Sequence, residues 1–210
     1  VRRSGRATAL ELAKHGASIA INTRQSVDEA NLVKTELEAL GVKAGVFVCD
    51  VTNEQGVADM VTKISEELGP VDILINNAGV ITRGKITEAT DEHYINSMLV
   101  NVEAPFRLCR AAIPIMSANG GGAIVNTSSC WGIYPGPDHP IYVMSKAAIA
   151  SLTQCLGRDH AHQNIRVSLT LNNTGKVSVV ERSKLSGSRL SVGSDRRDRH
   201  VHGMLEHAPH

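Results

Sequence analysis

Tyr142 and Lys146 lie one helical turn apart, and Ser129 ends an apolar run thirteen positions before Tyr142. Residues i and i+4 of a helix share a face, so the Lys146 ammonium is expected to approach the Tyr142 phenol. A free tyrosine titrates near pKa ~10, and a neighbouring cation lowers that pKa; reaching about 7 requires roughly 4 kcal/mol. With the Ser129 hydroxyl polarising a carbonyl beside the phenol, the set predicts a tuned proton donor. Taken alone, a Tyr-x-x-x-Lys pair is also typical of an exposed helix surface.

Alternating strand-like and helix-like segments are expected to position these side chains. Short apolar segments with strand character occupy residues 18–22, 44–49, 71–75, 121–128 and 165–169. Segments with helical periodicity lie between them, including one long helix expected from about Asp91 to Met116 despite the interior Pro105 and Pro114. This alternation indicates an α/β protein whose parallel sheet is covered by helices on both faces.

Polar or glycine residues follow three of the expected strands. They are Asp50-Val51, Asn76-Asn-Ala-Gly79 and Ser128-Ser129. Ligands of such sheets bind at the carboxyl ends of the strands, so we expect these residues to form a row along one edge. Polar residues at strand ends also occur in α/β proteins generally, and the row alone does not define a reaction.

Taken together, these residues resemble the motif set of the short-chain dehydrogenase/reductase family. The matching positions, in order, are Asn76–Gly79, Asn101, Ser129, Tyr142 and Lys146. The similarity covers about residues 5 to 167 and is closest in character to members like the 3-oxoacyl-acyl-carrier-protein reductases. It implies a doubly wound, Rossmann-like parallel sheet, a nicotinamide cofactor, and hydride transfer between that cofactor and a small carbonyl or alcohol.

The resemblance also implies a role for each catalytic position. Tyr142 would protonate the carbonyl oxygen during reduction, or deprotonate the alcohol during oxidation, while Ser129 hydrogen-bonds that oxygen. Lys146 would lower the pKa of Tyr142 and hold the nicotinamide ribose. Asn101 would anchor a water that passes protons from Lys146 to solvent; outside the family, such an asparagine would only satisfy the backbone of a helix kink.

The resemblance places the cofactor against a second group of residues. They are Gly5, Arg24, Asp50, Val51, Asn77, Ala78, Gly79, Tyr142 and Lys146. Asp50 would accept a hydrogen bond from the adenine amine, with Val51 packing nearby. Alternatively, Asp50 would be an aspartate that only stabilises a turn.

The residues after the strand at 18–22 favour one form of the cofactor. An acid there would bind the 2′-hydroxyl of NAD and repel the 2′-phosphate of NADP. The chain instead has Thr23 followed by Arg24, whose guanidinium suits a phosphate. NADP is therefore the expected cofactor, with NAD as the alternative and Arg24 as an ordinary solvated charge if that expectation fails.

Composition narrows the class of protein. A length of 210 residues suits one domain. The formal net charge of +1 indicates no nucleic-acid partner. The four cysteines are widely spaced and predict reduced thiols, not a disulfide framework or a zinc site. No apolar run approaches the ~20 residues that span a bilayer, so a cytoplasmic protein without a membrane partner is expected. By resemblance, the long helix and the Tyr142 helix would assemble a homodimer or homotetramer.

Both ends of the chain depart from the family pattern. The family begins with a central strand and a Thr-Gly-x-x-x-Gly-x-Gly loop, of which Gly5 matches only the last glycine while Arg3 occupies the middle one. The first strand is expected to be missing, which would leave strand edges unpaired and the phosphate cradle incomplete. After Val167 the expected Asn-x-x-x-Pro-Gly turn is absent, and a Ser/Arg/His-rich stretch follows.

These departures predict a Rossmann-like domain over residues 1–171 and an atypical, disordered tail over 172–210. A frameshift near Ser168 would produce such a change, and the chain is interpreted as a fragment. The tail histidines at 200, 202, 207 and 210 lack a helix or hairpin to fix them, so no metal site is expected. Two functions stay open: an oxidoreductase, or an inactive relative that serves only as a scaffold or oligomerisation partner.

Overall fold

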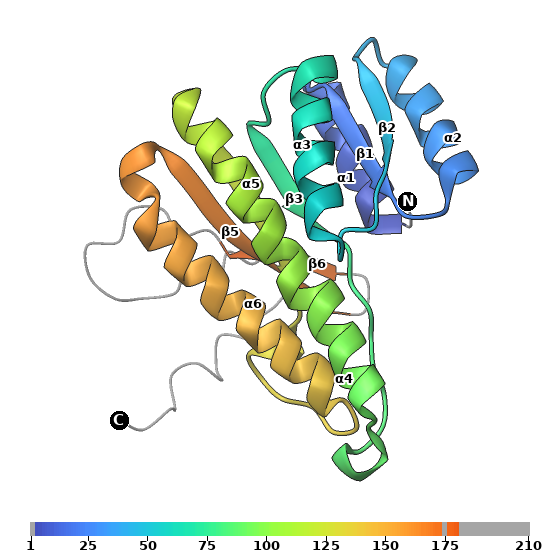
Figure 1. Cartoon of the computed structure of the whole chain (residues 1–210), viewed down its shortest axis with the longest axis vertical. Coiled ribbons are helices and arrows are strands. Elements are labelled where there is room, and N and C mark those ends of the chain that lie inside the picture. The colour runs from blue at the N-terminus through green and yellow to red at the C-terminus, as the bar shows by residue number, and fades with distance from the viewer. Residues whose placement is uncertain (1–2, 174–175, 181–210) are drawn as a thin grey trace.

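The computed structural model describes residues 3–173 and 176–180, with side chains over residues 4–171. Helices and strands alternate along most of this length (Figure 1). The elements are α1 (Arg3–Lys14), β1 (Ile19–Thr23), α2 (Val27–Glu38), β2 (Ala44–Val48), α3 (Glu54–Leu68), β3 (Ile73–Asn76), α4 (Asp91–Met98), a π-helical turn (Leu99–Glu103), α5 (Ala104–Ala118), β4 (Gly122–Ser128), α6 (Pro140–Asp159), β5 (Ile165–Asn173) and β6 (Lys176–Val180).

The strands form two sheets. One contains β1 and β2, paired in parallel. The other has the order β3-β4-β5-β6, in which β3, β4 and β5 are parallel and β6 is antiparallel to β5. The predicted α/β class with parallel strands and flanking helices is confirmed. Within the described residues, β1 pairs with β2 alone and β3 with β4 alone, so each has an unpaired edge, as expected for a sheet without its central strand.

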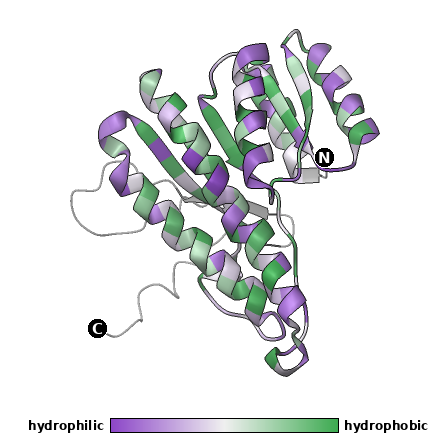
Figure 2. Ribbon diagram, in the orientation of Figure 1, coloured by the Kyte–Doolittle hydropathy of each residue, from purple (hydrophilic) through white to green (hydrophobic). Residues whose placement is uncertain are grey.

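Helices bury the apolar residues of both sheets. Ile19 and Ile21 of β1 belong to one core with residues of α1 and α2, whereas Ile124 of β4 and Val167 of β5 belong to another with residues of α5. Helix α3 contacts β1 and β2 and also α5, and thereby links the two sheets. Figure 2 shows most of β3, which is Ile-Leu-Ile before its last residue Asn76, as hydrophobic, while the surrounding helices carry both hydrophobic and hydrophilic residues, as amphipathic helices do.

The expected single helix from Asp91 to Met116 is divided in the structure. Helix α4 ends at Met98, the π-helical turn follows, and α5 begins at Ala104 with Pro105 in its first turn. The backbone stays helical across this junction, and Pro105, which has no N–H to donate to the preceding turn, directly follows the change of hydrogen-bond pattern. Single π-helical turns recur at functional sites, and this one contains the buried Asn101.

The predicted boundary between domain and tail stays a prediction. The backbone of β5 continues to Asn173, and β6 covers Lys176–Val180. The remainder of the predicted tail, including its histidines, lies outside the described residues. Among the helices that the structure describes, none combines the length and the apolar character needed to cross a membrane.

Candidate active site

The candidate catalytic residues come together at the carboxyl ends of β3 and β4. Asn76 and Asn126 are register partners in these parallel strands, so the two strands end close to each other. Asn77, Ala78 and Gly79 follow β3 as an exposed segment without regular structure. Ser129 follows β4, and the first turns of α6 bring Tyr142 to the same edge. Two of the three strand ends in the predicted row lie together here, whereas Asp50 and Val51 follow a strand of the other sheet.

Ser129 lies beside Tyr142. Its Oγ accepts from the Trp131 backbone N–H at 3.2 Å, and its hydroxyl beside the phenol favours the phenolate. Burial of the phenol has the larger effect, and the neighbouring Cys130 thiol acts in the same direction, so the pKa of Tyr142 lies above its ordinary value. The lowered pKa expected from the sequence is therefore not a property of the cofactor-free chain.

Lys146 is buried and makes a contact that its sequence spacing does not show. Its Nζ donates to the Thr127 carbonyl oxygen at 2.8 Å and lies 5.7 Å from the centroid of the Tyr142 ring. The side chain is 4% exposed, and burial lowers the pKa of Lys146 to about 8. The ammonium lies over the Tyr142 ring, and burial of the phenol remains the largest effect on the pKa of Tyr142.

Asn101 links the segment after β3 to helix α6. Its Oδ1 accepts from the Val80 backbone N–H at 2.8 Å, and its Nδ2 donates to the Val80 carbonyl at 2.9 Å and to Ser145 Oγ at 3.0 Å. The side chain thus satisfies backbone groups of a different segment, not those of a kink in its own helix. A Cβ at Gly79 would lie 3.2 Å from Asn101 Oδ1 and 3.4 Å from Lys146 Nζ. Glycine at this position therefore leaves room beside the lysine.

A second polar group lies at the carboxyl ends of β1 and β2. Asp50 Oδ1 accepts from the Thr52 backbone N–H at 3.0 Å and from the Thr52 hydroxyl at 2.8 Å. These bonds lower the pKa of Asp50, to which the nearby Arg24 contributes less. Arg24 Nη1 lies 3.7 Å from Asp50 Oδ2. Val51 follows in the same loop, and Gly5 lies in the first turns of α1, not in a glycine-rich loop.

Three further residues support this site, and the sequence alone did not predict what each of them does. Ser145 is fully buried and donates to the Tyr142 carbonyl at 2.8 Å while accepting from Asn101. Ser128 donates to the Lys146 carbonyl at 2.8 Å. A Cβ at Gly132 would lie 2.7 Å from the Lys146 carbonyl carbon. The only sequence signal for Ser145 is a polar residue on the apolar face of the helix.

Replacing Gly132 with alanine is expected to destabilise the protein by about 1–3 kcal/mol, because the added methyl would overlap backbone atoms of α6. Gly157→Ala is the matched control. It lies within α6, its nearest neighbour would be 3.8 Å away, and it should stabilise by about 0.5–1 kcal/mol. Urea denaturation of both variants measures the difference; equal stabilities would show that α6 can move away from Gly132.

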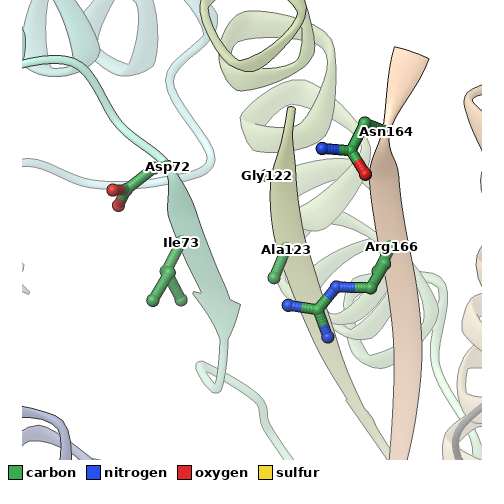
Figure 3. Close-up of a pocket in the computed structure, with 6 residues that line it drawn as sticks. All are labelled: Asp72, Ile73, Gly122, Ala123, Asn164 and Arg166. Carbon is green, nitrogen blue, oxygen red and sulfur yellow. The ribbon is translucent and has the colours of Figure 1, made fainter. Parts of the chain in front are cut away.

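Two hollows lie outside the Ser129–Tyr142–Lys146 cluster. Figure 3 shows one of about 200 Å³ at the amino ends of β3, β4 and β5, lined by Asp72, Ile73, Gly122, Ala123, Asn164 and Arg166. No predicted site residue lines it. The other, of about 450 Å³, is mainly apolar and lies between Ile86, the loop Pro135–Pro140 and Met144 of α6.

Aromatic residues between β4 and α6 lie close to Tyr142. The Trp131 ring packs edge-on to the Tyr142 ring at 6.4 Å between centroids, and the His139 ring lies 4.5 Å from Trp131. Tyr134, in contrast, is exposed. Among the described residues, no group of three or more His, Cys, Asp or Glu side chains is arranged to hold a metal ion.

Comparison with known proteins gives a consistent family match. The family model described as short chain dehydrogenase matches residues 4–182. The 3-oxoacyl-[acyl-carrier-protein] reductase of Thermotoga maritima is 32% identical over 164 residues, which are 78% of this chain and 66% of that protein. The chain thus spans just under two thirds of the length of this curated relative.

Solved structures share this fold. A xylitol dehydrogenase with bound NAD⁺ superposes with a TM-score of 0.76 at 32% identity, covering 79% of this chain and 64% of that one. The L-sorbose reductase of Gluconobacter frateurii, solved with NADPH and L-sorbose, gives a TM-score of 0.75 at 36% identity, covering 79% and 63%. One of these two neighbours was thus solved with NAD⁺ and the other with NADPH.

Proposed function

The chain belongs to the short-chain dehydrogenase/reductase family, and we propose that it transfers a hydride between a nicotinamide cofactor and a small carbonyl or alcohol. The observation that carries this proposal is the cluster of Ser129, Tyr142 and Lys146 at the carboxyl edge of the sheet, with Lys146 Nζ 5.7 Å from the centroid of the Tyr142 ring and Ser129 beside the phenol. Relatives of the chain include oxidoreductases with NAD⁺ or NADPH bound, which supports the reaction class.

The residues present fit such a cofactor. The backbone of Asn77–Gly79 is exposed, and the missing side chain at Gly79 leaves space beside Lys146. Lys146 would hold the nicotinamide ribose, and Asp50, already oriented by Thr52, would accept from the adenine amine. When bound, the cofactor supplies or accepts the hydride. Gly5 and the first turn of α1 would face its phosphates, because N–H groups at a helix N-terminus bind anions.

Proton transfer falls to Tyr142. Because burial raises the pKa of Tyr142, the phenol is protonated at neutral pH and can donate to a carbonyl oxygen as negative charge develops there. The Ser129 hydroxyl would hold the same oxygen. Lys146, with a pKa of about 8, keeps most of its positive charge at neutral pH and would stabilise the phenolate that donation leaves behind.

Arg24 supports NADP as the preferred cofactor, with NAD as the alternative. The Arg24 side chain is 61% exposed and directly follows β1, where a 2′-phosphate would be bound. The substrate would enter beside Trp131 and the loop Pro135–Pro140, whose neighbouring hollow is mainly apolar.

Assembly and location are part of the proposal. Exposed apolar residues on α4, α5 and α6, namely Tyr94, Ile95, Phe106 and Met144, support a homodimer or homotetramer formed through these helices. The free state of Cys49, Cys109, Cys130 and Cys155 supports a cytoplasmic enzyme.

The competing function, an inactive scaffold, is favoured by one observation: β1 and β3 each have an unpaired edge within the described residues.

A carbonyl-reduction screen separates the two functions. We expect the purified chain to oxidise NADPH in the presence of small ketones, aldehydes or 3-oxoacyl thioesters, and Ser129→Ala to reduce that rate because the carbonyl oxygen loses a hydrogen-bond donor. Ser151→Ala, an exposed serine on α6, is the control and should keep the rate of the parent chain. A folded chain that turns over none of these carbonyls would favour the scaffold.

A further inference from the structure

Arg24 and Asp50 form an ion pair across the two strands that carry them. Thr23 and Val48, the last residues of β1 and β2, are register partners, so the residues that follow emerge side by side. Arg24 Nη1 lies 3.7 Å from Asp50 Oδ2, and both side chains reach solvent, with 61% and 40% of their surfaces exposed. The guanidinium that is expected to bind a 2′-phosphate therefore already has an anionic partner.

The two members of this pair differ in how firmly they are held. Asp50 is fixed by the Thr52 backbone N–H and hydroxyl, which both bind its Oδ1. Arg24, in contrast, is held by its ion pair with the Asp50 carboxylate within the described part of the chain. Arginine is a long side chain that can rotate toward one anion or another, so the guanidinium is the member that must leave when a phosphate arrives.

We propose that Asp50 is a specificity-determining residue that competes with the cofactor 2′-phosphate for Arg24 and so weakens the preference for NADPH over NADH. This inference rests on the proposed function, since it requires the dinucleotide to lie across the ends of β1 and β2. NADH has no 2′-phosphate and therefore makes no ion pair with Arg24. Its binding therefore leaves the ion pair intact, whereas NADPH binding breaks it.

The ratio of the two dissociation constants isolates this effect. NADH and NADPH share the adenine, the pyrophosphate and the nicotinamide, so any change in the contact between Asp50 and the adenine cancels in the ratio. Exposed ion pairs alter equilibrium constants by only about twofold to fivefold. Removing the carboxylate should therefore raise the preference for NADPH by about that factor, and high salt should reduce the gain.

Asp50→Asn is the decisive variant, because the amide oxygen can still accept both Thr52 bonds while the charge is lost. Dissociation constants are measured for NADPH and NADH, and for adenosine 2′,5′-bisphosphate and AMP as probes without the nicotinamide. Asp159→Asn, an exposed aspartate at the far end of α6, is the charge-matched control and should leave every ratio unchanged. Melting curves verify that each variant is folded.

The same substitution in an Arg24→Gln background distinguishes competition from simple repulsion. We expect Asp50→Asn to raise the preference for the 2′-phosphate about twofold to fivefold in the parent chain and to have no effect without Arg24. A gain that persists in Arg24→Gln, or an unchanged ratio in the parent chain, overturns the proposal while leaving the oxidoreductase intact. Absence of binding by all four nucleotides to the folded parent chain overturns both.

Discussion

Tyr142→Phe is expected to lower kcat for carbonyl reduction by about a hundredfold to ten-thousandfold, the range in which a positioned acid or base contributes. The substitution keeps the ring that packs against Trp131 and removes only the phenol hydroxyl beside Ser129. NADPH affinity should change little, because the reduced cofactor binds without receiving a proton. Steady-state rates with a reactive ketone, together with a cofactor titration, measure both quantities.

Tyr94→Phe is the matched control for this experiment. Tyr94 is an exposed tyrosine on α4, and loss of its hydroxyl should leave both kcat and NADPH affinity at parental values. Retention of more than a tenth of the parental kcat in Tyr142→Phe would mean that another group supplies the proton.

Lys146→Met is expected to abolish reduction and at the same time to stabilise the folded chain. Burial lowers the pKa of Lys146 from 10.5 to about 8, so the folded state binds this proton less tightly than the unfolded state. The corresponding penalty is about 3 kcal/mol at pH 7, since one pKa unit is worth ~1.4 kcal/mol. Loss of the bond from Nζ to the Thr127 carbonyl offsets about 1–2 kcal/mol of the gain.

The sign of this effect can be followed with pH. Below about pH 8, both folded and unfolded chains carry the Lys146 proton, and the folded state bears the full penalty. Between about 8 and 10.5 the unfolded chain binds more protons, so the contribution of Lys146 to stability improves as pH rises. The Cys109 thiol, whose pKa burial raises to about 11, acts in the opposite direction above its ordinary value of 9.0. It is present in both chains and cancels in their difference.

Urea denaturation of the parent chain and Lys146→Met at pH 7 and at pH 9.5 measures the effect. The stability advantage of the variant should shrink toward the higher pH. Lys43→Met, a lysine outside the site in the turn before β2, is the control and should show no such dependence. An advantage that stays constant with pH would mean that the buried amine carries no protonation penalty.

Much of the site could be predicted because its residues depend on local spacing. The ends of the paired strands β3 and β4 bring Asn77 and Ser129 to one edge of their sheet, and one helical turn places Lys146 near Tyr142. What could not be predicted depends on packing between elements. The choice of the Thr127 carbonyl as partner of Lys146 follows from how closely α6 lies on β4, which the spacing within α6 does not determine.

The pKa of Tyr142 shows the same limit. The sequence supplies the cation and the hydroxyl that lower this pKa, but the depth of burial, which raises it, exists only in the folded chain. The long helix was likewise predicted from Asp91 to Met116 by its periodicity. Periodicity does not reveal the π-helical turn at Leu99–Glu103, because that turn is stabilised by the bonds of Asn101 to Val80 and Ser145.

The central claim is that this chain binds a nicotinamide cofactor across the carboxyl ends of its strands. A titration of the purified chain with NADPH, following the fluorescence of the reduced nicotinamide with NADH alongside, tests it most directly. The expected result is saturable binding of both cofactors, tighter for NADPH. A folded chain that binds neither cofactor would contradict the claim, because the cluster of Ser129, Tyr142 and Lys146 could then not take part in hydride transfer.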